Sequence, residues 1–259
     1  MERRKNPLFN QSLEKGLALL CAFGSHKKTM TISELAQASG MNKSSAQRMT
    51  YTLETLGYIE KHPRTGRFRL TVRVLQLGLN YLYANALIDM ANPFLSELSN
   101  MTGETACLTE PDDGEMVYVS RFVSASFVPV HMPIGSRIPM YCTSAGRAYL
   151  SALTDEQCQE ILQKQDRVKH TVHTKYKLPD IMSELQAARR RGYAVNTEEL
   201  FLGDMTLGAP VINNQGHPIA AVHIVAPTGR WDLRRARAKL APVLVSTARS
   251  LSNAVRGLE

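Results

Sequence analysis

The residues that could perform catalysis or bind a metal are few in this chain of 259 residues. His170 and His173 lie three residues apart, a spacing that suits a metal ion, but their Val- and Lys-rich surroundings favour an exposed loop. Glu198 and Glu199 form a pair of carboxylates only because they are neighbours in sequence. The segment Thr143-Ser144-Ala145-Gly146 could form a nucleophile turn, yet a close-packed helix start explains it more simply. We therefore predict no metal site and no catalytic residue.

The sequence motifs of the large cofactor-binding and hydrolytic classes are absent as well. Neither a Gly-x-Gly-x-x-Gly fingerprint, nor a P-loop, nor a Gly-x-Ser-x-Gly elbow occurs. The four cysteines contain no Cys-x-x-Cys pair, which indicates reduced thiols rather than disulfides or a zinc knuckle. Cys142 precedes a helix start that could make it a reactive thiolate, but a packed small side chain is the simpler interpretation. No cofactor is expected.

The composition describes a chain that can bury a core of its own. Hydrophobic residues make up 44% and charged residues 21%, as in ordinary globular domains. No window approaches the roughly 18 consecutive apolar residues needed to span a membrane, and the start MERRKNPLFNQ lacks the apolar stretch of a secretory signal. We expect a cytoplasmic protein without a membrane partner.

The net charge of +8 is concentrated at one end of the chain. Residues 1–70 contain 12 Lys or Arg against 5 Asp or Glu, whereas residues 71–259 contain 19 against 18. A basic head on a nearly neutral body indicates that the head binds a polyanion. A solvated charged face is the alternative, and the motifs of the same segment decide between the two.

Polar and basic side chains gather on one face of the helix predicted over residues 43–56. Its apolar stripe consists of Ala46, Met49, Leu53 and Leu56, so the opposite face is free to enter the major groove of DNA. Side chains there reach base edges and phosphates, and cations on a following hairpin can contact the backbone or the minor groove. We predict DNA contacts from Thr31, Lys43, Ser44, Ser45, Gln47, Arg48, Tyr51, Lys61, Arg64, Arg67 and Arg69.

Capping residues mark the helices that carry this face. Thr31 and Glu34 fit a capping box, and Ser12 and Asn42 are placed as N-caps of their helices. The pattern predicts three helices over residues 13–23, 32–38 and 43–56, then a hairpin with strands 58–61 and 68–70. This order is that of a helix-turn-helix with a wing.

The rest of the chain reads as a helical linker and an α+β domain. Residues 72–101 return to helical period with Pro93 interrupting, which predicts two helices or one bent helix. Strands are predicted over 105–109, 116–122, 127–132, 193–196, 206–212 and 219–225, and helices over 144–153, 155–165, 179–191 and 233–255. Because strands and helices do not alternate strictly, a mostly antiparallel sheet is expected.

Several separate motifs, in this order, resemble the IclR family of bacterial transcription regulators over about Gln11 to Leu251. They are Thr31-Ile32-Ser33-Glu34-Leu35-Ala36, Asn42-Lys43-Ser44-Ser45-Ala46-Gln47-Arg48, Leu53-Glu54-Thr55-Leu56-Gly57-Tyr58-Ile59, Gly135-Ser136-Arg137-Ile138-Pro139-Met140, Thr143-Ser144-Ala145-Gly146-Arg147-Ala148, Arg190-Arg191-Gly192-Tyr193-Ala194 and Ala209-Pro210-Val211. The resemblance implies a winged helix-turn-helix DNA-binding domain (1–71), a helical linker used in dimerisation (72–101) and a GAF-like effector-binding domain (102–259).

The resemblance also implies the lining of an effector pocket, at Phe127, Val130, Ser144, Ala145, Asn196, Thr206, His223 and Val225. Asn196 stands where an aspartate is usual in the family, Thr206 where a cysteine is usual, and His223 where a serine is usual. These differences remove a negative charge and add a group that can be cationic, so we expect a small organic acid, aliphatic or aromatic. Its carboxylate is expected near Ser144 or His223, with the helix-start amides and the free Thr143 and Ser144 hydroxyls as further donors. The alternative is a packed histidine beside a mere gap in the core.

The expected function is therefore a ligand-responsive transcription regulator of catabolic genes, acting as a repressor or an activator. Its expected partners are an operator in double-stranded DNA, a small-molecule effector and a second copy of the chain, and the resulting homodimer can pair again into a tetramer. Two alternatives stay open: an enzyme acting on small acids with a basic docking appendage, and an architectural DNA-binding protein whose second domain is empty.

Overall fold

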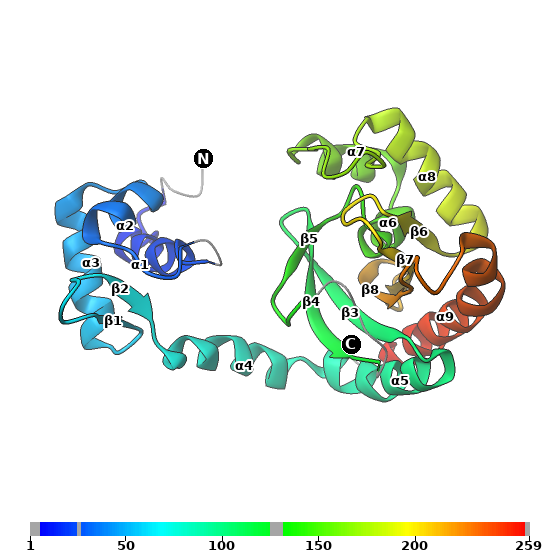
Figure 1. The fold of residues 1–259 in the computed structure, drawn as a ribbon, viewed down its shortest axis with the longest axis horizontal. Coiled ribbons are helices and arrows are strands. Elements are labelled where there is room, and N and C mark those ends of the chain that lie inside the picture. Colours follow the sequence, from blue (N-terminus) through cyan, green and yellow to red (C-terminus); the bar gives the residue numbers. More distant parts are fainter. Residues whose placement is uncertain (1–5, 25–26, 125–131, 257–259) are drawn as a thin grey trace. The chain divides into compact units, whose positions relative to one another are not determined.

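The computed structural model describes residues 6–24, 27–124 and 132–256. The chain divides into two compact units, Met1–Tyr81 and Leu82–Glu259, which we describe separately (Figure 1). Within the described ranges, no helix is both long and apolar enough to cross a membrane.

The N-terminal unit has three helices and a two-stranded antiparallel hairpin. They are α1 (Gln11–Cys21), α2 (Ile32–Ala38), α3 (Lys43–Thr55), β1 (Ile59–Lys61) and β2 (Phe68–Leu70). Its core consists of the buried residues Leu19, Met30, Leu35, Leu53, Ile59 and Phe68. The Thr31–Glu34 capping box opens α2, and Asn42 Oδ1 accepts the Ser45 N–H at 2.8 Å to open α3. The winged helix-turn-helix order predicted from the sequence is confirmed.

Two local predictions for this unit are wrong. Helix α1 is capped by Asn10, whose side chain accepts from Ser12 and Leu13, so Ser12 lies inside the helix. The inward face of α3 holds Ala46, Thr50 and Leu53, whereas Leu56 follows the last helical residue and is 50% exposed. Thr50 is tolerated there because its hydroxyl donates to the Ala46 carbonyl at 2.9 Å.

The helical segment between the hairpin and the sheet is broken at Asn85. A 3-10 turn (Val72–Val74) leads into α4 (Leu75–Ala84), and α5 (Ala86–Thr102) follows. The Asn85 side chain accepts the Leu87 N–H at 3.0 Å and so caps α5. Pro93 lies inside α5 without ending it. The segment thus forms two helices, as predicted. The first helix ends before Asn85, which caps the second, and not at Pro93.

The C-terminal unit is built on a six-stranded antiparallel sheet in the order β5-β4-β3-β8-β7-β6. The strands are β3 (Thr105–Asp112), β4 (Glu115–Phe122), β5 (Arg137–Pro139), β6 (Ala194–Thr197), β7 (Met205–Ile212) and β8 (Pro218–Val225). Helices α5 and α9 (Leu233–Val255) share one apolar core with the sheet. Helices α6 (Ser144–Ser151), α7 (Asp155–Gln163) and α8 (Leu178–Arg191) share a second core with it (Figure 1).

The α+β class with an antiparallel sheet is as predicted, with differences at one sheet edge. The strand expected over 127–132 lies outside the described residues except for Met132, which belongs to no strand. The edge strand β5, which pairs with β4, was not predicted, because three residues are too short for a recognisable alternating pattern.

Candidate functional sites

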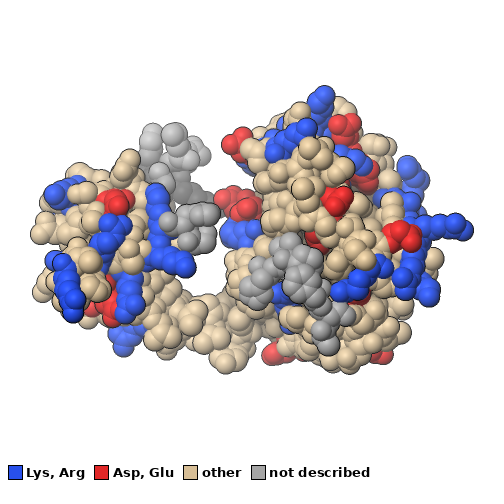
Figure 2. All heavy atoms as spheres, in the orientation of Figure 1, with Lys and Arg blue, Asp and Glu red and all other residues tan. Residues whose placement is uncertain are grey.

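The exposed face of α3 is polar and basic, as predicted. Lys43, Ser44, Gln47, Arg48 and Tyr51 are all exposed, and Tyr51 is 72% exposed. All of these except Lys43 line a groove with Lys61 of β1. Figure 2 shows Lys and Arg side chains spread over this unit, with few acidic ones on the face in view.

Three of the predicted contacts have partners within the unit. Thr31 uses its hydroxyl to accept the Glu34 N–H. Arg67 donates to the carbonyl of Thr29 at 2.8 Å and forms an ion pair with Glu34, also at 2.8 Å. Arg69 forms an ion pair with Glu60 on the neighbouring strand.

These partners give the three residues a structural role. Arg67 and Arg69 thus pair with carboxylates of their own unit, while their side chains stay 35% and 65% exposed; their predicted DNA contacts remain a prediction. Arg64, at the tip of the hairpin, is exposed and forms no ion pair with any described residue. Ser45 is half-buried, with its hydroxyl at the sulfur of Met41.

In the C-terminal unit, one row of residues crosses five strands of the sheet. The register pairs Arg121 with Cys107, Cys107 with His223, His223 with Gly208 and Gly208 with Ala194. Directly paired residues point to the same side of a sheet. The row therefore forms a floor on the face that α6 covers.

A second row lies two residues further along each of four strands. Thr105 pairs with Val225, Val225 with Thr206, and Thr206 with Asn196. Because the side-chain period of a strand is two residues, this row faces the same side as the first. Two rows of a single face thus supply most of the polar groups of one pocket.

The backbone of the first turn of α6 packs directly against the backbone of this part of the sheet. A Cβ atom on Gly208 would lie 2.6 Å from the Ser144 carbonyl oxygen, and one on Gly146 would lie 2.2 Å from the Met140 Cα. Both positions therefore require a residue without a side chain. The Ser144 hydroxyl donates to Thr206 Oγ1 at 2.8 Å and so ties the helix start to β7.

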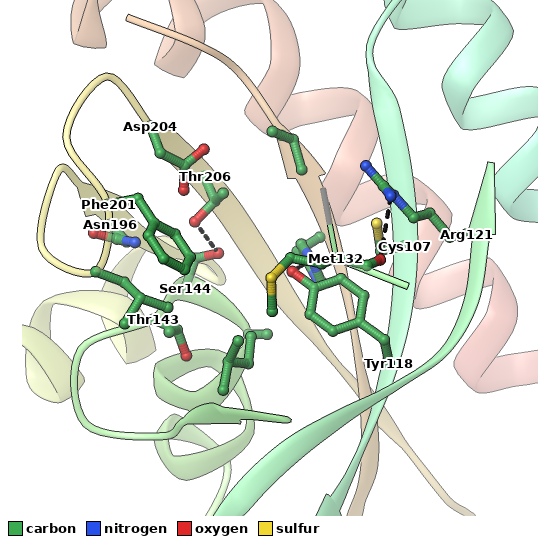
Figure 3. A pocket seen from close by; sticks show the side chains of 15 residues that line it. Cys107, Tyr118, Arg121, Met132, Thr143, Ser144, Asn196, Phe201, Asp204 and Thr206 are labelled. Atoms are coloured by element: carbon green, nitrogen blue, oxygen red, sulfur yellow. Dashed lines mark hydrogen bonds between the residues drawn. The ribbon is translucent and has the colours of Figure 1, made fainter. Parts of the chain in front are cut away.

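A pocket opens beside this helix start (Figure 3). The cavity itself is small, with a volume of about 30 Å³ among the described residues. Its lining comprises Cys107, Tyr118, Arg121, Met132, Ile138, Thr143, Ser144, Ala145, Asn196, Leu200, Phe201, Asp204, Thr206, His223 and Val225. Such a mixture of apolar walls and a few polar groups is typical of small-molecule sites.

The cation of the pocket is Arg121, not His223. Burial, with a smaller contribution from the nearby charge of Arg121, lowers the pKa of His223 to about 3. His223 is therefore neutral at physiological pH, and the expectation that it contributes a positive charge is wrong. Its Nε2 is hydrogen-bonded to the Tyr118 hydroxyl at 3.2 Å, while its Nδ1 has no partner in the described structure. The half-buried Arg121 donates to the Met132 carbonyl at 3.1 Å and keeps its charge at the pocket wall.

The hydroxyls at the helix start are engaged, although we expected them to be free donors. Ser144 donates to Thr206, as described above, and Thr143 donates to the Pro139 carbonyl at 2.7 Å. Thr143 Oγ1 also accepts the Gly146 N–H at 3.2 Å, as a helix cap does. Both hydroxyl protons are therefore used in hydrogen bonds within the protein, which hold the start of α6 in position.

A buried ion pair lies on the other side of α6. Arg147 is 1% exposed and binds both carboxylate oxygens of Glu199, at 2.5 and 2.7 Å. Arg147 also donates to the Tyr141 carbonyl at 2.8 Å, and the Glu199 N–H is accepted by Asn196 Oδ1 at 3.0 Å. The pair therefore joins α6 to the segment after β6 that carries Phe201, and the Glu199 N–H joins that segment to Asn196 of β6; Asn196 and Phe201 both line the pocket.

Six of the eight residues predicted to line the effector pocket line the pocket described above. Ser144, Ala145, Asn196, Thr206, His223 and Val225 all line this pocket, whereas Phe127 and Val130 lie outside the described residues. The pattern missed Arg121, Tyr118, Cys107 and Asp204. The available signal was Arg121, the one charged residue in the mostly apolar stretch Met116–Phe122.

The other candidates for chemistry have structural partners. His170 is hydrogen-bonded to the Tyr141 hydroxyl at 2.8 Å, and His173 lies 3.7 Å from Glu198 in an exposed loop. Burial raises the pKa of Cys142 to about 12, which fits a packed thiol and not a reactive one. Within the described ranges, no three His, Cys, Asp or Glu residues are grouped so that they could hold a metal ion.

Comparison with known proteins identifies relatives of both units. The family descriptions "Bacterial transcriptional regulator IclR C-terminal" and "IclR helix-turn-helix domain" match residues 79–253 and 12–63. The chain is 33% identical to the p-hydroxybenzoate hydroxylase transcriptional activator of Acinetobacter baylyi, over 94% of this chain and 91% of the relative.

Solved structures agree with these matches. A transcriptional regulator from Rhodococcus sp. RHA1 has a TM-score of 0.83 at 32% identity, covering 97% of this chain and 100% of that one. An IclR homolog from Microbacterium hydrocarbonoxydans, solved in complex with 4-hydroxybenzoate, shares the fold with a TM-score of 0.77 at 19% identity, covering 95% and 100% of the two chains.

Proposed function

The chain belongs to the IclR family of bacterial transcription regulators, and from this premise we propose which of its residues read DNA and which bind its effector. As a member it is a ligand-responsive DNA-binding regulator of catabolic genes and not an enzyme. The observation that carries the proposal is the row of Arg121, Cys107 and His223 under the start of α6, which supplies a cation and neutral donors in one pocket. Because the partner is DNA, we place the protein in the cytoplasm.

The DNA contacts are assigned to α3 and the hairpin tip. Lys43, Ser44, Gln47, Arg48 and Tyr51 present an exposed polar face of the kind that enters the major groove. Arg64 is proposed to contact a phosphate, because it is exposed and forms no ion pair with a described residue. Thr31, Arg67 and Arg69 are assigned to holding the hairpin and α2 in position.

Arg48→Ala should weaken operator binding by about 1–3 kcal/mol and relax the sequence preference, because a bidentate contact to a base edge is lost. Arg64→Ala should weaken binding to all sequences alike and reduce the slope of log affinity against log salt by about one. Mobility shifts with operator and scrambled DNA at several salt concentrations measure both effects. An equal, salt-independent loss from the two variants would contradict this division.

The effector is proposed to be a small organic acid whose carboxylate binds Arg121. A guanidinium matches a carboxylate with two parallel donors, and partial burial strengthens the pair relative to water. The neutral His223 and the Tyr118 hydroxyl lie within the same wall and can add hydrogen bonds. Relatives named for p-hydroxybenzoate hydroxylase control and for 4-hydroxybenzoate binding support acids as the class.

Arg121→Gln should lower the affinity for an acid effector by about ten- to a hundredfold, because a charge-assisted pair is replaced by a neutral one. His223→Gln, which removes no charge, should have the smaller effect. Calorimetric titration of both variants with the same acid tests this order. Stabilisation of the wild type by an acid in a thermal-shift measurement would also exclude an empty second domain. Equal affinities of wild type and both variants would place the site elsewhere.

We further propose that the protein is a homodimer joined through α4, with a tetramer as the next assembly. Helix α4 exposes a set of large apolar side chains: Leu75, Leu77, Leu79, Tyr81 and Tyr83. Exposed apolar surface of this kind marks an interface, and two DNA-binding units give affinity for two half-sites. A stable monomer at micromolar concentration in sedimentation experiments, with full operator affinity, would overturn the proposal.

A further inference from the structure

Asp204 brings a carboxylate into the effector pocket on the side away from Arg121. Figure 3 shows Asp204 with Thr206 and Ser144 on one side, Arg121 with Cys107 on the other, and Met132 and Tyr118 between them. The residue is 9% exposed. Within the part of the chain that the structure describes, no hydrogen bond or ion pair reaches its side chain.

A carboxylate that loses most of its hydration without gaining a hydrogen bond from the protein raises the free energy of the folded state. Burial accordingly raises the pKa of Asp204 to about 6. A second unsatisfied group faces the same pocket, because Nδ1 of the fully buried His223 has no partner among the described atoms. The pocket thus contains one buried nitrogen without a partner and one nearly buried carboxylate to which no described group donates, and a ligand with suitable donors can bond to both.

The neutral acceptors beside Asp204 each hold one hydrogen bond. Thr206 Oγ1 accepts the Ser144 hydroxyl, and Asn196 Oδ1 accepts the Glu199 N–H. The Asp204 carboxylate holds none among the described residues, and an ionised carboxylate is the stronger acceptor. A hydroxyl brings a single donor and fits one acceptor group, whereas an ammonium brings three donors and would leave some of them unpaired.

We propose that the pocket selects acids that carry a hydroxyl group remote from the carboxylate, with the hydroxyl donating to Asp204. This inference rests on the proposed binding of the carboxylate to Arg121. The apolar residues Met132, Ile138, Phe201 and Val225 line the pocket between or beside the polar ends. Asp204 thereby acts as a specificity-determining residue, which rejects the same acid without its hydroxyl because the buried carboxylate then stays unpaired.

The test uses two matched pairs of acids, benzoate with 4-hydroxybenzoate and butyrate with 4-hydroxybutyrate, and one amine, 4-(aminomethyl)benzoate. Each is titrated calorimetrically into the full-length wild type, Asp204→Ala, Asp204→Asn and Arg121→Gln. In at least one pair, the wild type should bind the hydroxy acid tenfold or more tightly than its partner, about the worth of a hydrogen bond to a charged group. Asp204→Ala should abolish that preference and leave the plain acid within about threefold, and Asp204→Asn, which keeps an acceptor, should lie between.

The controls separate failure of this inference from failure of the proposed function. Asp180→Ala, an exposed acid at the start of α8, should change neither affinity nor preference. If the wild type binds both members of each pair equally and Arg121→Gln weakens both, the acid site stands and the role of Asp204 is refuted. If no acid binds, or Arg121→Gln has no effect, the proposed acid site itself fails. Tightest binding of the amine, lost in Asp204→Ala, would show that Asp204 holds a cation instead.

Discussion

Replacing Arg147 with methionine should destabilise the C-terminal unit by about 3–5 kcal/mol, because the carboxylate of Glu199 is then buried without its partner. The two side chains are 1% and 5% exposed, so solvent can compensate little of the lost pairing. Lys175 would still donate its N–H to Glu199 at 2.9 Å, but one neutral donor does not replace a bidentate guanidinium. Removing both charges in Arg147→Met/Glu199→Leu should recover much of the loss, since an apolar pair of similar volume avoids the desolvation cost.

The measurement can be restricted to the correct unit, because the chain has a single tryptophan. Trp231 is buried in the C-terminal unit, and its indole N–H donates to Glu104 at 2.6 Å, so its fluorescence reports on that unit. Urea unfolding followed by this signal gives the free energies of the variants. The control is Lys164→Met, which breaks the exposed Lys164–Glu160 pair and should leave the unfolding midpoint unchanged. A double variant no more stable than Arg147→Met would refute the explanation by an unpaired buried charge.

The ion pair matters for function because of what it connects. The Glu199 carboxylate accepts the backbone N–H of Lys175 and binds Arg147 on α6. Its own N–H is held by Asn196, whose side chain lines the pocket. Loss of the pair should therefore loosen the 198–204 loop that carries Phe201 and Asp204. The same contact that stabilises the unit keeps one wall of the pocket in place.

The N-terminal unit could be predicted from the sequence almost completely, because its signals are local. A capping box, an Asn cap and glycine stops each act within four residues of chain, and Thr31, Glu34 and Asn42 form the contacts expected of them. The failures there come from competition between nearby groups. Asn10 and Ser12 could both cap α1, and Asn10 does so.

The effector pocket could be predicted only in part, for a topological reason. Arg121, Cys107 and His223 become neighbours through a sheet in which β3 lies between β4 and β8, so residues more than a hundred positions apart share one row. Periodicity gives the face of each strand but not which strands pair, or in which register. Without the register, Arg121 reads as one more surface charge, and His223 reads as exposed enough to be protonated. In the paired sheet, Arg121 is instead half-buried at the pocket wall, and His223 is fully buried and neutral.

Gly208→Ala should lower the affinity for the effector at least tenfold while leaving operator binding in place. The backbone of Gly208 has no left-handed conformation, so alanine is excluded by space alone. Its Cβ would lie 2.6 Å from the Ser144 carbonyl oxygen and 2.7 Å from the carbonyl carbon, whereas ordinary contacts are 3.4–4 Å. Since the obstacle is backbone, no side-chain rotation relieves it, and the start of α6 must move away from β7.

That movement takes Ser144 and Ala145 out of the positions that define the pocket. It also stretches the 2.8 Å hydrogen bond between Ser144 and Thr206. We expect a loss of stability of about 1–3 kcal/mol, the usual cost of overpacking, and an effector affinity lowered at least tenfold. Gly229→Ala is the matched control, because it lies in the same unit, lacks a left-handed backbone and has nothing within 4 Å of the added Cβ. Calorimetric titration with an acid that binds the wild type, together with mobility shifts, gives both readouts. Effector affinity as in the wild type would mean that the contact between α6 and β7 does not shape the site.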